Sequence, residues 1–297
     1  MAYPFTKIAI IYNPNSTGDS KDNATELATH LKKRLPKSIK VELIATQSAG
    51  HAEDLARELA SGTQKVLLVS SSGDGGFNEV LNGLLAANNP NAAAIVLPSG
   101  NANDHHEATS ERSVEEKIIS PKVESVDAIK LTGMKDGATF ERHAHSYIGA
   151  GLTAYIGKKL TEATLNPINE KLLVLKYLFL FKGVTLKVEP DVRWHRYSSV
   201  VFGNIGKMSK IIKLAPEADY DDGKMEVYEH KTNSTLKTVT MLVFGSMFGL
   251  SANAQLKQLS FISKHSIEAQ FDGEVIVLDG NQPITVSVDR NAYKTLQ

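Results

Sequence analysis

The first 100 residues alternate two hydrophobic periodicities, and this alternation limits the fold more than any other feature of the chain. Between short apolar runs, apolar residues recur every three or four positions, as at Leu27, Leu31 and Leu35, which is typical of amphipathic helices. Strands this apolar, separated by helices, indicate a parallel sheet that is covered on both faces. The apolar runs, each rich in strand-forming residues, lie at 7–12, 41–45, 66–69 and 93–97.

The pattern changes near residue 130. From about Lys122 onward, strand-like alternation replaces most of the helical periodicity, and a length of 297 residues suits two domains of roughly 150 residues each. We therefore expect an α/β domain over 1–130 and a mostly β domain over 131–297, with the extreme C-terminus as a candidate to pack back on the first domain. The strand-like segments of the second domain are 139–148, 184–192, 198–202, 267–271 and 284–288.

Composition excludes several classes of protein. The 33 basic residues balance the 33 acidic ones, so net charge gives no argument for a nucleic-acid partner. Without Cys, the chain has no disulfide, thiolate nucleophile or Cys-ligated zinc. The N-terminus runs into the first expected strand without a signal-peptide pattern, and no apolar cluster reaches the ~18 residues of a membrane span. We expect a cytoplasmic protein with at most peripheral membrane contact.

Three polar loops follow the expected strands, at 13–18, 71–76 and 98–104. The carboxyl ends of strands in an open α/β sheet are where ligands bind. In the middle loop, Ser72-Gly73-Asp74-Gly75-Gly76 precedes a helix; its glycines let backbone N–H groups approach an anion, and the helix N-terminus favours phosphate. The spacing fits neither a Walker A motif nor the dinucleotide fingerprint. The alternative is a plain strand-to-helix turn.

Two acidic motifs lie in the second half. Asp272-Gly273-Glu274 places two carboxylates on a turn between strand-like segments, which suits orientation or deprotonation of a hydroxyl; a solvated hairpin turn is the alternative. Asp219, Asp221 and Asp222 are closely spaced before Gly223, which suits a hard cation or a solvated acidic turn.

These motifs occur in the order and approximate spacing of the diacylglycerol kinase catalytic-domain family. The chain resembles soluble bacterial lipid kinases of that family, related to sphingosine and ceramide kinases, over nearly its whole length. The resemblance implies an NAD-kinase- or phosphofructokinase-like first domain, ATP and Mg²⁺ as cofactors, a lipid hydroxyl such as that of diacylglycerol as acceptor, and an active site in the cleft between the domains. It rests on Asn13-Pro14…Gly18, Thr46…Gly50-His51-Ala52, Gly73-Asp74-Gly75…Asn78-Glu79, Pro98…Gly100…Asn103-Asp104, Leu214-Ala215-Pro216…Asp222-Gly223 and Asp272-Gly273-Glu274.

The resemblance also assigns roles to residues. Glu274 is the implied general base, Asp272 orients it or the metal, and Asp74 completes the catalytic set. A Mg²⁺ outside the phosphate site would take the Asp222 carboxylate and the backbones of Asp219 and Lys224. The implied ATP-binding positions are Asn13, Pro14, Asn15, Ser16, Gly18, Thr46, Ser72, Gly73, Gly75, Gly76, Asn78, Glu79, Gly100, Asn101, Asn103 and Asp104.

Two departures from the family pattern affect the phosphate loops. The family usually has Gly-Gly-Asp-Gly-Thr where this chain has Ser72 to Gly76, and Gly-Thr where it has Gly100-Asn101. The loss of two hydroxyls is expected to alter nucleotide affinity. It also suggests one alternative function, a catalytically silent nucleotide- or lipid-binding module. The presence of Asp74, Asp272 and Glu274 argues against that alternative. A second alternative is an NAD kinase-like enzyme, although the late Asp-Gly-Glu follows the lipid-kinase pattern.

Candidate partners follow from the same half of the chain. Nine of the ten residues 172–181 are apolar, and 182–213 holds seven Lys or Arg against two acids. For a lipid kinase these segments indicate peripheral contact with a membrane surface that holds the lipid substrate; a core helix and a solvated face are the alternatives. A zinc site at His143 and His145 is not favoured, because we interpret them as exposed strand positions. A homodimer is left open.

Overall fold

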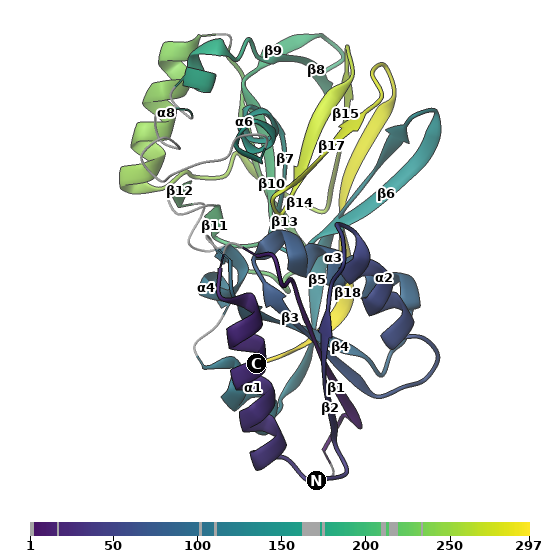
Figure 1. Cartoon of the computed structure of the whole chain (residues 1–297). Helices are drawn as coiled ribbons and strands as arrows, with labels where there is room; N and C mark the ends of the chain where they lie inside the picture. Colours follow the sequence, from purple (N-terminus) through teal and green to yellow (C-terminus); the bar gives the residue numbers. More distant parts are fainter. Residues whose placement is uncertain are drawn as a thin grey trace. The chain divides into compact units, whose positions relative to one another are not determined.

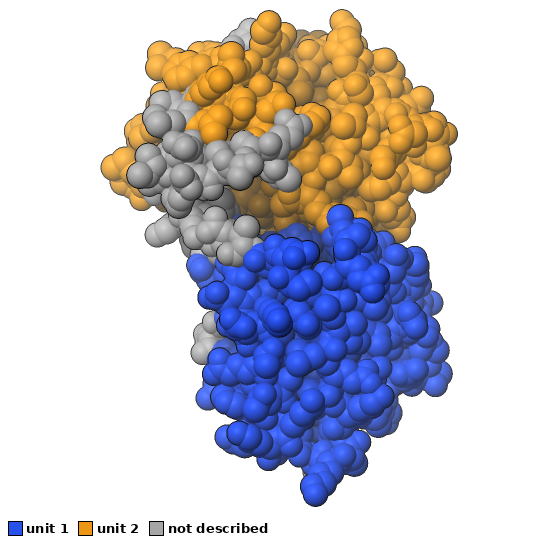
Figure 2. Space-filling model, viewed as in Figure 1, with its two compact units in different colours: residues 1–127, 290–297 blue, residues 128–289 orange. Residues whose placement is uncertain are grey.

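The computed structural model describes residues 3–16, 18–100, 103–109, 112–161, 173, 176–208, 212–213, 219–232 and 234–297 (Figure 1). It divides into two compact units, coloured separately in Figure 2. The first unit comprises Met1–Asp127 and Arg290–Gln297, and the second comprises Ala128–Asp289. The chain leaves the first unit within β5 (Val123–Lys135) and returns to it within β18 (Pro283–Leu296).

The first unit is the expected α/β domain with a parallel sheet. Its strands are ordered β2-β1-β3-β4 and pair in parallel (Figure 1). The order reverses between β1 and β3, and such a switch point leaves a ligand crevice beyond the strand ends. The elements are β1 (Lys7–Tyr12), α1 (Ser20–Arg34), β2 (Lys40–Ala45), α2 (His51–Leu59), β3 (Val66–Ser72), α3 (Asp74–Ala87), β4 (Ala93–Pro98), α4 (Asp104–Thr109) and α5 (Val114–Ile119).

Both faces of this sheet are buried. Ile8 and Ile10 share a core cluster with α1 and α5, while Ala9 and Ile11 point to the opposite face and are equally buried because successive side chains alternate across a strand. Helices α2 and α3 pack closely, since a Cβ on Gly83 would lie 2.2 Å from the Glu53 carbonyl oxygen. The continuous apolar runs of the sequence reflect this burial on both faces.

The second unit is mostly β, as expected. One sheet has the order β14-β13-β10-β7-β16-β17 and another has β6-β5-β18-β15-β8-β9. A shared core joins them, in which Phe202 of β10 stacks on Phe261 of β15 at 6.1 Å between ring centroids. The further elements are β6 (Ala138–Ala144), β7 (Tyr147–Gly151), α6 (Leu152–Thr161), β8 (Val184–Val188), β9 (His195–Tyr197), β10 (Ser199–Gly203), β11 (Lys207–Met208), β12 (Ile212–Lys213), β13 (Met225–His230), α8 (Thr235–Phe248), β14 (Ala254–Leu256), β15 (Gln258–Ser263), β16 (Ile267–Phe271) and β17 (Glu274–Leu278).

Two expected strands of the second unit differ in the structure. The segment 139–148 is not one strand: β6 ends at Ala144, β7 begins at Tyr147, and the two belong to different sheets. The segment 184–192 is strand only as far as Val188, because Pro190 has no N–H to donate to a neighbouring strand. The first break matters for the candidate site, since a carboxylate from elsewhere in the chain binds the backbone there.

Helix α8 was not anticipated from the sequence. The Ser234 side chain accepts a hydrogen bond from the Lys237 N–H at its start, and Gly249 follows its last residue at φ 82°. Thr238 and Gly245 on its inner side are buried. Within the described ranges, neither α8 nor any other helix combines the length and the hydropathy needed to cross a bilayer.

Candidate active site

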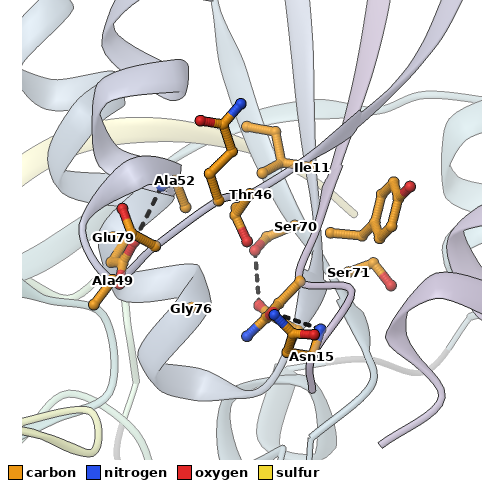
Figure 3. Close-up of a pocket in the computed structure, with 14 residues that line it drawn as sticks. Ile11, Asn15, Thr46, Ala49, Ala52, Ser70, Ser71, Gly76 and Glu79 are labelled. Atoms are coloured by element: carbon orange, nitrogen blue, oxygen red, sulfur yellow. Dashed lines mark hydrogen bonds between the residues drawn. The ribbon is translucent and has the colours of Figure 1, made fainter.

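A pocket of about 310 Å³ opens at the carboxyl ends of β1, β2 and β3 (Figure 3). Its walls come from the loop after β1, the loop after β2, the end of β3 and the first turns of α3, so it lies at the switch point of the sheet. The lining is Ile11, Tyr12, Asn13, Asn15, Thr46, Gln47, Ser48, Ala49, Ala52, Ser70, Ser71, Ser72, Gly76 and Glu79.

Part of the predicted nucleotide set meets in this pocket. Asn13, Asn15, Thr46, Ser72, Gly76 and Glu79 line it. The lining also includes polar residues that the sequence did not single out: Tyr12, Gln47, Ser48, Ser70 and Ser71. Each of these lies within two positions of a predicted residue, so the polar ends of the strands were the available signal.

Glu79 builds one wall of the pocket by capping α2. Its two carboxylate oxygens accept hydrogen bonds from the N–H groups of Gly50 at 3.1 Å and Ala52 at 3.2 Å, and Figure 3 shows the bond to Ala52. A carboxylate at a helix N-terminus satisfies free N–H groups and interacts favourably with the helix dipole. Gly50 has φ 78°, which glycine adopts without strain. Glu79 therefore fixes the loop after β2 against α3.

At the start of α3, the Ser72 side chain fills the space next to the Gly76 Cα. A Cβ on Gly76 would lie 2.6 Å from the Ser72 Cβ and 2.8 Å from its Oγ. The Ser72 hydroxyl lies 2.7 Å from the Ser70 hydroxyl. The side chain at position 72 thus fills the volume that a side chain at position 76 would need, and Ser72 places a hydroxyl in the lining of the pocket.

Buried serines tie the loops behind the pocket together. The Ser71 hydroxyl donates to the Ser20 carbonyl at 2.7 Å and lies 3.0 Å from the Ser99 hydroxyl. Ser20 accepts from the Asn13 N–H at 3.2 Å. These contacts join the first turn of α1, the end of β3 and the loop after β4, so the pocket's polar edge is held rigidly.

Asp74 caps the helix that follows β4. Its carboxylate oxygens accept from the N–H groups of Asp104 at 3.0 Å and His105 at 3.1 Å. Next to it, Gly73 and Gly100 touch through their backbones, because a Cβ on Gly100 would lie 2.3 Å from the Gly73 Cα. The two predicted phosphate loops are therefore in direct contact, and Asp74 fastens one to the other.

The remaining predicted nucleotide residues lie around these loops. Asn103, at φ 55°, exchanges two hydrogen bonds with the Gly100 backbone, and a Cβ on Gly18 would collide with the Ser99 carbonyl oxygen at 2.3 Å. Asn78 is buried and accepts a hydrogen bond from Asn82. Pro14 and Ser16 lie in the loop after β1, Gly75 lies in the first turn of α3, and Asp104 begins α4; none of the four lines the pocket. Asn101 lies outside the described residues.

Asp272 occupies the two-residue turn between β16 and β17. It has φ 48° and Gly273 has φ 106°, a combination that Asp-Gly turns accommodate. Its fully buried carboxylate accepts from the N–H groups of His145, Ser146 and Tyr147 at 2.8, 3.0 and 2.9 Å. Asp272 therefore holds the break between β6 and β7 and anchors the turn that carries Glu274.

Glu274 opens β17 directly after that turn. Its side chain is 32% exposed, and its Oε2 accepts a hydrogen bond from the Arg142 guanidinium at 2.7 Å. Arg142, which the sequence did not indicate, comes from β6. The ion pair fixes the direction of the carboxylate while part of it stays open to solvent, as a carboxylate that meets a ligand requires.

The predicted Mg²⁺ ligands lie on the turn before β13. Asp219, Asp222 and Lys224 are exposed, and one Asp222 oxygen accepts the Lys224 N–H at 2.8 Å. No three metal-ligating side chains converge anywhere in the described part of the chain. The side chains alone therefore form no complete cation site, and the predicted set, which takes two of its ligands from the backbone, stays a prediction.

The environment of Glu226, two residues beyond Lys224, favours a cation on the turn before β13. It is buried, Gln255 donates to its Oε1 at 3.1 Å, and its Oε2 has no hydrogen-bond partner among the described residues. Burial raises the pKa of Glu226, and the charges of Asp222 and Asp219 raise it further, while the Gln255 hydrogen bond lowers it. A cation bound beside the Glu226 carboxylate would offset that cost.

The interpretation of His143 and His145 as exposed strand positions is wrong. His143 is 9% exposed and His145 is fully buried. They contact different carboxylates, since His143 lies 3.1 Å from Asp289 and His145 lies 3.2 Å from Asp272. His145 stands at the break between β6 and β7, where strand alternation no longer predicts which side chains are exposed.

Known proteins match this chain most clearly in its first unit. Residues 7–131, which contain the pocket and both phosphate loops, match the model of the diacylglycerol kinase catalytic domain. The chain is 27% identical over 225 residues to a diacylglycerol kinase of Staphylococcus saprophyticus, covering 72% of this chain and 69% of that one. A diacylglycerol kinase of Staphylococcus aureus strain MRSA252 is 27% identical over 227 residues, covering 72% and 67%.

Solved structures of two kinds of kinase share the fold. A diacylglycerol kinase from Bacillus anthracis superposes with a TM-score of 0.72 at 19% identity, covering 100% of this chain and 98% of that one. Yeast NADH kinase, solved with NADH, superposes with a TM-score of 0.53 at 13% identity, covering 98% and 82%. The expected likeness to the NAD kinase fold is thereby confirmed, and at these identities the likeness concerns the fold alone.

Proposed function

We propose that this diacylglycerol kinase-family chain transfers the γ-phosphoryl group of ATP to the hydroxyl of a lipid, diacylglycerol or a similar molecule. The observation that carries the proposal is the polar pocket at the switch point of the first unit, where Gly76 and the start of α3 lie beside serine hydroxyls. Free N–H groups at a helix N-terminus and its positive dipole favour phosphate there. The family match over the same residues supports ATP as the molecule that brings the phosphates.

In this reaction the acceptor oxygen attacks the γ-phosphorus as the bond to the ADP oxygen breaks, and the hydroxyl proton moves to a carboxylate. Glu274 is the proposed acceptor of that proton, because its carboxylate is partly exposed and held in one direction by Arg142. Mg²⁺ bound with ATP would neutralise charge on the phosphates. Asp272, whose oxygens are bound to three backbone N–H groups, positions Glu274 rather than contacting the substrate.

The experiment is transfer of label from [γ-³²P]ATP to a panel of acceptors, run with and without Mg²⁺. The panel holds a short-chain diacylglycerol, ceramide, sphingosine and NAD. The proposal expects Mg²⁺-dependent label in a lipid and none in NAD. Label in NAD alone would favour the NAD kinase-like alternative, and ATP binding without any transfer would favour a silent binding module; either result contradicts the proposal.

A further inference from the structure

Exposed apolar side chains gather in two segments of the second unit. Among the described residues, every exposed Phe lies in these segments. Such contiguous exposure marks an interaction surface more often than isolated apolar residues do. The set, called the apolar face here, consists of Phe179 and Leu180, which are 64 and 53% exposed, and of Leu236, Val243, Phe244, Met247 and Phe248 of α8, which are 75, 51, 58, 66 and 73% exposed.

Helix α8 is light green in Figure 1. It buries small residues and exposes several of its large apolar side chains. Small residues face inward: Thr238 and Gly245 are buried, and a Cβ on Gly245 would meet the Leu250 side chain at 2.7 Å. The outward residues recur at spacings of three and four, which places them on one side of the helix. Surface helices normally turn their apolar side to the core, so this outward side indicates a partner.

The second segment lies beside the start of α8. A small cavity is lined jointly by Leu178, Phe181 and Lys182 and by Thr235 and Thr238 of α8. Leu178 is buried, and the half-buried Phe181 ring packs 5.3 Å from the Tyr155 ring. The segment is therefore anchored through these two residues, which leaves Phe179 and Leu180 outward and continuous with α8.

The two stretches of sequence that carry the apolar face contain lysines but no acidic residues. No Asp or Glu occurs in residues 171–188 or 230–267. The first range holds Lys176 and Lys182, and the second holds the exposed Lys237 in the first turn of α8. Lys231, at the start of the second range, lies 3.7 Å from the Asp191 carboxylate and is paired with it. An apolar face whose own segments hold lysines and no acidic residues is complementary to a lipid surface that carries anionic headgroups. A second copy of this chain, with a net charge of +0, offers no excess of negative charge to these lysines.

We propose that the apolar face docks on the surface of an anionic bilayer, with the Phe, Met and Leu side chains entering the interface and the lysines contacting headgroups. The choice of a bilayer rests in part on the proposed function, because diacylglycerol resides in membranes. A docking site on α8 would bring the chain to a lipid acceptor that is held in a bilayer.

The test is co-sedimentation with vesicles of pure phosphatidylcholine and of phosphatidylcholine with phosphatidylglycerol. Three proteins are compared: the parent, the double variant Phe244→Ser/Phe248→Ser, and a control, Leu43→Ser/Val123→Ser, which removes exposed apolar side chains from the first unit. The parent and the control should bind the anionic vesicles, and the α8 variant should bind at least about tenfold more weakly. Its melting temperature should not fall, since the two rings are exposed.

Two outcomes overturn the proposal: equal binding by the α8 variant and the parent, and no binding by the parent. Light scattering tests a third such outcome. If the parent is a dimer and the α8 variant is a monomer, the apolar face is an interface between copies of the chain. Phosphorylation of a soluble short-chain diacylglycerol separates this proposal from the proposed function. Such activity without vesicle binding refutes only the docking, whereas binding that needs α8, without any kinase activity, refutes only the function.

Discussion

Ser72 and Gly76 show how a single contact changes the meaning of a motif. The family usually has Gly where this chain has Ser72, and Thr where this chain has Gly76. A Cβ at position 76 would lie 2.6 Å from the Ser72 Cβ and overlap it. The hydroxyl that the sequence loses at position 76 is therefore present at position 72, on the same pocket. The departure from the family pattern is therefore an exchange of side-chain volume between two neighbouring positions.

This exchange predicts strong coupling between the two positions. Gly76→Thr alone should lower the melting temperature and weaken ATP binding, because it forces Ser72 and the start of α3 apart. Ser72→Gly/Gly76→Thr should recover most of both losses, with a coupling energy of about 1 to 3 kcal/mol. Calorimetric titration with ATP and thermal melting of the parent, both single variants and the double variant measure it. Additive effects would show that the two side chains do not share the space.

Glu226 gives the protein a pH dependence with a definite sign. Its pKa is raised by burial, so the folded state holds the proton more strongly than the unfolded state, and stability falls as pH rises above the ordinary glutamate range. Glu226→Gln should then melt higher than the parent at pH 8, with the difference shrinking towards pH 4. Added Mg²⁺ should raise the melting temperature of the parent more than that of the variant. A difference independent of pH would contradict the burial argument.

At the scale of elements, the parallel strands were the easiest part of the fold to predict. The apolar runs 7–12 and 93–97 correspond to β1 and β4 within one residue, because burial on both faces leaves a continuous apolar signature. The break between β6 and β7 could not be predicted, since the carboxylate that binds its N–H groups comes from Asp272, far along the chain. Helix α8 was missed because its large apolar side chains face outward.

The role of Asp272 as an anchor is testable in the same region. Asp272→Ala removes a buried acceptor of three N–H groups and should lower the free energy of unfolding by about 3 kcal/mol or more. Asp279→Ala is the matched control, because Asp279 accepts two N–H groups in an exposed turn, from Asp136 and Gly137. Denaturant unfolding followed by circular dichroism compares them. Equal losses would show that burial of the Asp272 carboxylate carries no additional stability.

For the molecule as a whole, the sequence located the loops of the candidate site better than the contacts within it. The motif residues Asn13, Thr46 and Gly76 do line one pocket, because the carboxyl ends of parallel strands meet at one edge. The capping roles of Glu79 and Asp74 and the pairing of Arg142 with Glu274 depend on partners from other elements, which spacing along the chain does not reveal. Each unit has its own core, so the pocket and Glu274 are built independently.

The most direct test of the account is to separate ATP binding in the first unit from proton transfer by Glu274 in the second. Glu274→Gln should lower kcat for diacylglycerol by about 10² or more, with an unchanged Kd for ATP and an unchanged melting temperature. Glu141→Gln, an exposed carboxylate of β6, should retain the parent's kcat. If Glu274→Gln turns over as fast as the parent, or loses activity only because ATP no longer binds, Glu274 is not the base and the account is wrong.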